Sequence, residues 1–312
     1  MVNENLNIGL SKAFRDNPKI SEYREIPVNE NCFERLANID FEPNVVFCQI
    51  QNDKIGKRNT LDLNPTLQKF RNLYDSFIIS WNGDIRQNTP IWMRSFYSSI
   101  TCFTNHRDVD YARDNWGHSS DFLQIGIDPE VFNKNHNLGM TVPEIVFFGN
   151  HAGHFPLSGF RKQAVTQLKK RYGNRFQVYG NGYREAKTSF NADPRNPNEN
   201  QIKESYIYSR AKVGISISHF NSEGYFSDRL LRGMASGCCM LSHSFPGHEE
   251  MFSNNHISVF KDIPDLLRVC DMLLDDDGHR NEVAKRGHDY AHANHTYHNM
   301  VDDILKLYEK WS

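Results

Sequence analysis

Several features are missing from this 312-residue sequence, and each absence narrows the class of protein. No apolar run approaches the roughly 20 residues that a membrane-spanning helix needs. The N-terminal residues MVNENLNIGLSKAF lack a basic segment followed by an apolar one, so we expect no secretory signal and a cytoplasmic location. A formal net charge of −2 excludes a uniformly basic nucleic-acid-binding protein.

Common signatures of metal and nucleotide chemistry are also missing. The 6 cysteines form no C-x-x-C pair and the 14 histidines form no H-E-x-x-H motif. Walker A, G-x-G-x-x-G and G-x-S-x-G motifs are absent as well. Asp108-Val109-Asp110 has the D-x-D form of metal-dependent sugar transferases, but its polar helical surroundings favour a solvated helix face. We therefore expect no metal site and no resident cofactor.

Short apolar runs alternate with helical stretches along most of the chain. The runs are apolar on both faces, which is typical of parallel strands covered by helices on both sides. Alternation of this kind predicts an α/β fold with two Rossmann-like, doubly wound domains. The strand-like runs are residues 44–50, 76–82, 99–105, 121–127, 144–150, 176–180, 213–218, 238–243 and 257–260. The clearest helical stretches are residues 65–76, 160–173, 227–237, 262–276 and 296–311.

A polar seam divides the alternating pattern. Residues 128–143, DPEVFNKNHNLGMTVP, contain two prolines and a glycine and show no periodicity. We place the domain boundary inside it, with a first domain over residues 1–134 and a second over 135–296. A further polar stretch, residues 187–201, is too long for an ordinary turn and is interpreted as a functional or mobile loop.

Ligands of doubly wound domains bind at the carboxyl ends of the strands, so the residues after each strand are the first candidates. The turn Gly149–Asn150 follows the run 144–150 and leads through further glycines into a helix that carries Arg161. Backbone N–H groups of such a loop can bind a phosphate, and the arginine adds positive charge. Taken alone, this loop reads more simply as an ordinary surface loop.

The loop after the run 213–218 gives a stronger signal. It contains Glu223–Gly224, and a helix begins after Ser227, its expected N-cap. Arg229 and Arg232 share one face near that end, although the helix dipole disfavours cations there. An anionic ligand would account for them. The alternative is that Arg229 pairs with Asp228 or with the glutamate of the loop.

Asp84 follows the run 76–82 in the first domain. An acid at the mouth of a strand can act as a general base or bind an acceptor hydroxyl. The competing interpretation is that it caps the next helix or pairs with Arg86.

Several motifs follow one another in a fixed order: Ser-x-Arg at 227–229, Ala-x-Gly at 235–237, Pro-Gly-x-Glu-Glu-x-Phe at 246–252 and His-Thr at 295–296, with SWNGD at 80–84 and LQIGIDPEVF at 123–132. Their order resembles that of GT-B glycosyltransferases, particularly the spore-maturation CgeB-like group. The resemblance covers roughly residues 76–312. It implies a nucleotide-sugar donor held mainly by the second domain, no metal, and a final helix, 297–312, that returns to the first domain.

The resemblance and the loops together give a set of candidate residues. The expected donor-binding residues are Gly149, Asn150, Arg161, Tyr179, Gly180, Glu223, Gly224, Ser227, Asp228, Arg229 and Arg232, with the nucleobase near Tyr179, Gly180 and Gly182; Asp84 is the expected catalytic residue on the acceptor side. One departure is notable. Related enzymes carry a glutamate three residues after the arginine of Ser-x-Arg, assigned to the donor ribose, and this chain has Arg232 there. That contact is either absent or supplied by Glu223 or Asp228.

The favoured function is a metal-independent glycosyltransferase. A nucleotide-sugar epimerase of the same fold and a non-catalytic nucleotide-sugar-binding protein are the alternatives. The acceptor is open among a glycan, a protein, a small molecule and a modified DNA base. For a nucleic-acid acceptor, Lys54, Lys57 and Arg58 would be the phosphate contacts, although a solvated turn is the preferred interpretation of that loop.

Overall fold

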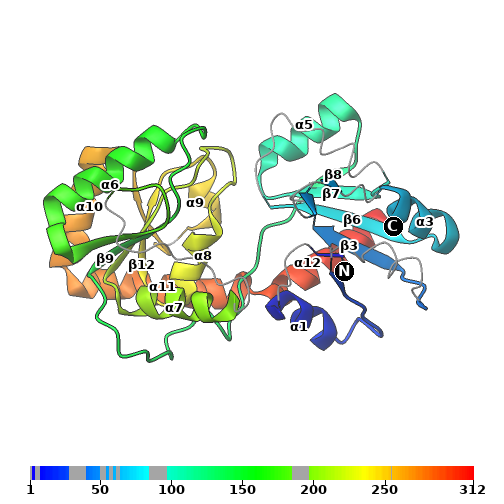
Figure 1. Cartoon of the computed structure of the whole chain (residues 1–312), viewed down its shortest axis with the longest axis horizontal. Helices are drawn as coiled ribbons and strands as arrows, with labels where there is room; N and C mark the ends of the chain where they lie inside the picture. The colour runs from blue at the N-terminus through cyan, green and yellow to red at the C-terminus, as the bar shows by residue number, and fades with distance from the viewer. Residues whose placement is uncertain are drawn as a thin grey trace. The chain divides into compact units, whose positions relative to one another are not determined.

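The structure is a computed structural model that describes residues 2–3, 8–27, 40–49, 54–55, 59–60, 64–83, 97–184, 197–253 and 255–312. They form two compact units (Figure 1). The first unit comprises Met1–Gly126 and Tyr297–Ser312, and the second comprises Ile127–Thr296.

A parallel sheet organises the first unit. Its strands run in the order β2-β1-β3-β6-β7-β8, and a separate antiparallel pair joins β4 to β5. The bounds are β1 Val2–Asn3, β2 Ile26–Pro27, β3 Val45–Gln49, β4 Lys54–Ile55, β5 Asn59–Thr60, β6 Phe77–Asn82, β7 Ile100–Phe103 and β8 Ser120–Phe122. The helices are α1 Ile8–Asp16, α3 Asn64–Tyr74, α5 His106–Trp116 and α12 Tyr297–Trp311.

Helices cover both faces of this sheet. Ile79 and Trp81 of β6 pack in one cluster with α1 and α12, whereas Ile78 packs with Leu67 and Phe70 of α3. Successive residues of the strand are therefore buried on opposite faces, which is why the run reads as continuously apolar.

The second unit repeats the design with a five-stranded parallel sheet in the order β10-β9-β11-β12-β13. Its strands are β9 Ile145–Phe148, β10 Phe176–Tyr179, β11 Val213–Ser216, β12 Cys239–His243 and β13 Ser258–Phe260. Its helices are α6 Ser158–Tyr172, η1 Gly173–Arg175, α7 Pro197–Arg210, α8 Asp228–Ala235, α9 His248–Met251, α10 Ile263–Asp275 and α11 Asp277–Asn294.

The order of the strands places a topological switch at β9. β10 pairs with one edge of β9 and β11 with the other. Phe147 of β9 faces Arg161 of α6, while its neighbour Phe148 contacts Tyr208 of α7. The two connections thus leave on opposite faces, and a crevice is expected at the carboxyl ends of these strands. The predicted fold class of two parallel-sheet α/β domains is confirmed.

The division between the units falls at residue 127 rather than at 135. Ile127 pairs with Thr296 and donates its N–H to the carbonyl of His295 over 2.8 Å, both in the second unit. Further along, Phe132 lies 5.3 Å under the guanidinium of Arg232. Buried apolar side chains inside the polar seam therefore attach residues 127–134 to the second unit.

Three smaller expectations also change. The strand expected over 121–127 ends at Phe122, and residues 197–201 of the expected loop begin α7. The rest of that loop, residues 187–196, lies outside the described residues. Asp108 is buried instead of solvated, because its carboxylate accepts a 3.0 Å hydrogen bond from the side chain of Asn105.

The basic loop that contains Lys54, Lys57 and Arg58 is described only in part. Lys54 lies in β4, while Lys57 and Arg58 fall outside the described residues.

In the part of the chain that is described, no helix combines the length and the apolar character needed to cross a bilayer.

Candidate functional site

The loops that follow β9 and β10 are joined at the carboxyl edge of the second sheet. Gly149 donates its N–H to the carbonyl of Tyr179 and His151 donates to that of Asn181, both over 2.8 Å. The side chain of Asn150 accepts from the N–H of Asn181, also over 2.8 Å. The side chain of Asn150 thus braces the two loops.

Two further candidates fix how closely these loops approach. A Cβ on Gly180 would overlap the carbonyl group of Gly149, so only glycine permits the contact. Tyr179 stacks on Phe148 with ring centroids 4.8 Å apart. The structure therefore brings Gly149, Asn150, Tyr179 and Gly180 together.

Arg161 of α6 is fully buried, at 0% exposure. One guanidinium nitrogen, Nη1, lies 2.7 Å from Nδ1 of His219. The other two nitrogens, Nε and Nη2, are sealed from solvent and hydrogen-bond to no described residue. Burial lowers the pKa of Arg161 to about 10, so the group still carries its charge at neutral pH. The guanidinium lies against Gly149 of the expected phosphate loop, and the charge that the sequence assigns to Arg161 in donor binding stays a prediction.

His219 was not identified from the sequence. It follows β11 closely, on the same edge of the sheet, and its ring lies 4.3 Å from that of Phe155. Burial, together with the positive charges of Arg161 and Arg229, lowers the pKa of His219 to about 3. The only available signal was its position directly after the run 213–218, which the large number of histidines obscured.

Ser227 occupies the N-cap position of α8, but its side chain does not cap the helix. Its hydroxyl lies 3.2 Å from a carboxylate oxygen of Asp228, and its N–H donates to the hydroxyl of Ser218 over 3.0 Å. Ser227 therefore does not supply the side-chain oxygen that an N-cap residue commonly gives to the first turn, and the N–H of Leu230 donates to the carbonyl of Ser227 over 2.9 Å instead.

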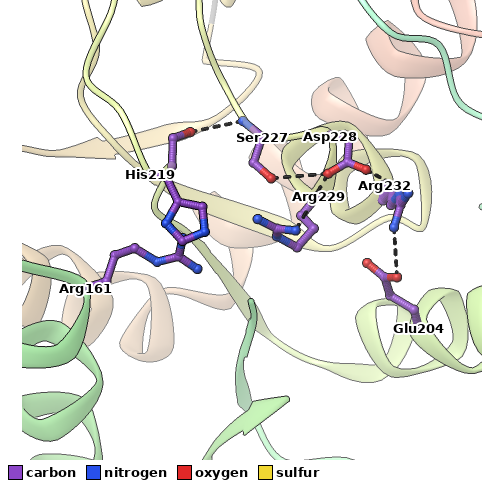
Figure 2. A network of polar contacts seen from close by, with 8 residues as sticks. Arg161, Glu204, His219, Ser227, Asp228, Arg229 and Arg232 are labelled. Atoms are coloured by element: carbon purple, nitrogen blue, oxygen red, sulfur yellow. Dashed lines mark hydrogen bonds and ion pairs between the residues drawn. The ribbon is translucent and has the colours of Figure 1, made fainter. Parts of the chain in front are cut away.

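The two arginines of α8 have different surroundings (Figure 2). Arg232 forms ion pairs with Asp228 at 2.7 Å and with Glu204 of α7 at 3.2 Å. The guanidinium of Arg229 has only a long contact of 3.9 Å with Asp228 and hydrogen-bonds to no described residue, and the side chain is 28% exposed. The charge of Arg232 is thus balanced by acids of the chain itself. The guanidinium N–H groups of Arg229 remain available to a ligand.

Arg232 favours the ionised form of both acids near α8, Asp228 and Glu204. Burial alone would raise the pKa of Asp228, but Arg232 and Arg229 outweigh it, lower that pKa and keep the carboxylate ionised. Burial raises the pKa of Glu204, and Arg232 offsets only part of that effect. Arg161 and Arg229 therefore leave a local excess of positive charge at the carboxyl ends of β9 and β11.

The Glu223–Gly224 loop adjoins a hollow of about 450 Å³. Glu223 is exposed, and the N–H of Gly224 donates to the carbonyl of Pro246 over 3.0 Å. Gly224 has φ of 70°, a conformation that favours glycine. The hollow is lined by Asn221, Ser244, Phe245, Pro246, Gly247, His248, Glu249, Glu250 and Lys261.

The acceptor side is described only in part. Asp84, the expected catalytic residue, lies outside the described residues. Just before it, the carbonyl of Gly83 accepts a 3.1 Å hydrogen bond from the hydroxyl of Thr104. Across the described ranges, no three acidic, histidine or cysteine side chains are grouped to hold a metal ion.

Comparison with known proteins gives one match by sequence and many by structure. Residues 161–306 match the family described as "Glycosyl transferase-like". No curated protein matches the chain. A glycosyltransferase from Rickettsia africae superposes with a TM-score of 0.59 at 12% identity, covering 99% of this chain and 97% of the other. The chain has the GT-B fold.

Two other solved structures support this assignment. The α,α-trehalose 6-phosphate synthase from Burkholderia multivorans gives a TM-score of 0.57 at 9% identity, covering 96% of this chain and 81% of that one. HepE from Anabaena, solved with UDP and glucose, gives 0.57 at 9% identity, covering 85% and 77%. At such low identity these likenesses concern the fold alone.

Proposed function

We propose that the protein is a glycosyltransferase that moves a sugar from a nucleoside diphosphate sugar to an acceptor hydroxyl without a metal ion. The observation that carries the proposal is the open guanidinium of Arg229 beside the uncapped start of α8. Both lie at the sheet edge where ligands of this architecture bind. The glycosyl transferase-like match over residues 161–306 and the UDP and glucose bound to HepE support it.

The chemistry of glycosyl transfer suits this arrangement. Negative charge develops on the departing nucleoside diphosphate, and preorganised donors aimed at that charge stabilise the transition state. The partial positive charge at the N-terminus of α8 and the guanidinium of Arg229 supply such stabilisation. The polar side chains around the neighbouring hollow can bind the hydroxyl groups of the sugar.

The remaining assignments follow the same proposal. Asp228 is already paired with Arg232, so the exposed Glu223 is the better candidate for the donor ribose. The nucleobase of the donor is assigned to the loops at Tyr179 and Gly180. Asp84 remains the predicted catalytic general base. The residues quoted above favour a CgeB-like enzyme with no resident cofactor. The five cysteines in the described part of the chain are free and buried, which fits the reducing cytoplasm.

Calorimetric titration of nucleoside diphosphates tests the proposal. Arg229→Ala is expected to weaken binding about 10- to 150-fold, because a charge-assisted hydrogen bond contributes about 1.5–3 kcal/mol. Arg229→Lys should fall between, since an ammonium cannot reproduce the guanidinium fork. Arg268→Ala is the matched control, because that side chain is 67% exposed on α10. EDTA should change none of these affinities.

Equal affinities of wild type and a folded Arg229→Ala variant would contradict the phosphate-binding role. Loss of binding in EDTA would contradict the metal-free mechanism. Turnover of the donor without an acceptor would favour the epimerase. Tight binding without transfer to glycan, protein, small-molecule or DNA acceptors would favour a binding protein.

A further inference from the structure

We infer that His219 is an uncharged hydrogen-bond donor to the diphosphate group of the ligand and that the buried Arg161 fixes it in that form. The inference rests on the nucleotide-binding function proposed above. It assigns a contact to a residue that neither the sequence motifs nor the fold comparison singled out.

The hydrogen bond between the two side chains determines where the imidazole carries its proton. A guanidinium has donors and no acceptor, so Nδ1 of His219 must accept the 2.7 Å hydrogen bond from Nη1 of Arg161. A neutral imidazole that accepts at Nδ1 carries its proton on Nε2. That nitrogen hydrogen-bonds to no described residue and is not among the sealed polar atoms. His219 therefore presents one free N–H donor.

Burial, which disfavours the charged form, and then the charged neighbours keep the ring neutral. Arg161 on α6, Arg229 on α8, and His154 and His151 in the loop after β9 all act against a positive charge on His219. A second proton on the ring would also have to go to Nδ1, which would break the hydrogen bond from Arg161. The donor is therefore present throughout the range from mildly acidic to mildly basic pH.

Arg161 acts through His219 because it is itself inaccessible. It is 0% exposed, and the two nitrogens not bonded to His219 are sealed. Apart from its charge, Arg161 can therefore influence the ligand only through the imidazole that it orients. Arg161 is a positioning residue and His219 is the contact.

The direction of the donor agrees with the rest of the site. Figure 2 shows the imidazole of His219 directly above the guanidinium of Arg161, with the guanidinium of Arg229 to the right of both, and both guanidinium groups act electrostatically on the ring. One free N–H of His219 and the open donors of Arg229 are thus close to the same anionic ligand.

Two amide substitutions separate the roles of the two ring nitrogens. His219→Asn places an oxygen near the position of Nδ1, so Arg161 keeps an acceptor while the outer donor is lost. His219→Gln places an N–H near the position of Nε2, so the donor is kept while Arg161 loses its acceptor. Inorganic pyrophosphate and UDP, measured by calorimetry, are the probes.

We expect His219→Asn to keep the wild-type melting temperature and to bind both probes about 10-fold or more weakly. His219→Gln should melt at a lower temperature but recover part of the affinity. The ratio of wild-type to Asn affinity for UDP-glucose should stay constant between pH 5.5 and 8, because His219 stays neutral throughout this range. Wild-type affinity in the Asn variant, or a ratio that grows as pH falls, would overturn the inference.

A ligand-independent measurement separates this inference from the proposed function. Nitrogen-15 spectra should show His219 as the neutral Nε2–H form across this pH range in wild type and in Arg161→Lys, which also donates to Nδ1. In Arg161→Met the residue should lose that preference and titrate closer to 6.5. Titration of His219 near 6.5 in wild type contradicts the inference. If wild type binds neither pyrophosphate nor any nucleoside diphosphate, the proposed function fails and the contact fails with it.

Discussion

At the scale of single residues, the buried Arg161 and the partly buried Arg232 show two ways of holding a guanidinium. Arg232 is held by the carboxylates of Asp228 and Glu204. Arg161 forms no ion pair with a described acid; it hydrogen-bonds to the neutral His219, and its other polar neighbour is the hydroxyl of Tyr183. Burying a charge without a counterion is costly. Such a cost is typical of functional sites and agrees with an anion that binds there.

Gly149 makes room for this arginine, and its substitution tests the packing. A Cβ on Gly149 would collide with Nη2 of Arg161. Gly149→Ala should lower the free energy of unfolding by about 1–3 kcal/mol, the usual cost of overpacking. Gly159→Ala is the control, because a Cβ there meets nothing within 4 Å. Urea unfolding measures both, and equal stability of the two variants would show that Arg161 moves aside freely.

At the scale of secondary-structure elements, one cluster of charges joins α7 to α8. Arg232 pairs with Asp228 one turn earlier on its own helix and with Glu204 on α7. Oε1 of Glu204 is buried and hydrogen-bonds to no described residue. The stability of this helix contact therefore depends on a single guanidinium.

Arg232→Met should destabilise the protein by about 3–5 kcal/mol at neutral pH, because it leaves buried acids unpaired. Burial already raises the pKa of Glu204, and loss of the arginine should raise it further. A raised folded-state pKa means that stability is greatest at low pH and is lost as pH rises from the unfolded value through the folded one.

The deficit of this variant should therefore shrink toward pH 4 in urea unfolding. Lys203→Met is the control, since Lys203 forms an exposed ion pair with Glu199, and both residues lie on α7. It should cost less than about 1 kcal/mol at any pH. A deficit of Arg232→Met that does not depend on pH would exclude Glu204 as its source.

Elements were easier to predict from the sequence than the site. Strands such as β9 and β11 were found within two residues, because burial on both faces leaves a continuous apolar run. The sequence places the domain boundary at 134–135 and the structure places it at 127, because a few buried residues such as Phe132 attach part of a polar stretch to the second unit. Burial of Arg161 and its pairing with His219 join residues 58 positions apart, and no local pattern encodes such a contact.

At the scale of the whole molecule, the C-terminal helix completes the first unit after the chain has passed through the second. The residues that α12 contributes to the first core are Tyr297, Met300, Val301, Ile304 and Leu307. Near its end, Lys310 and Trp311 donate to the carboxylate of Asp121 over 2.6 and 3.0 Å. Burial alone would raise the pKa of Asp121, but these hydrogen bonds outweigh it and lower that pKa. The folded first unit thus requires both ends of the chain.

The distribution of tryptophan allows this dependence to be measured directly. All 4 tryptophans, at positions 81, 92, 116 and 311, fall in the segments of the first unit. Tryptophan fluorescence therefore reports unfolding of that unit alone, whereas far-ultraviolet circular dichroism reports both. Chains with two domains need not unfold in one step, so the two signals can be compared within one titration.

Ile304→Ala should destabilise the first unit by about 2–5 kcal/mol, because Ile304 is 1% exposed and its truncation leaves a cavity in that core. The fluorescence transition should move to lower urea concentration, while the part of the dichroism change that belongs to the second unit stays in place. Lys306→Ala on the exposed side of α12 is the matched control and should move neither, since its side chain is 69% exposed. UDP should then raise only the midpoint of the second transition, because a ligand stabilises only the unit that binds it. A common shift of both transitions in Ile304→Ala would mean that the two units unfold together, and α12 would then stabilise the whole chain instead of the first unit alone.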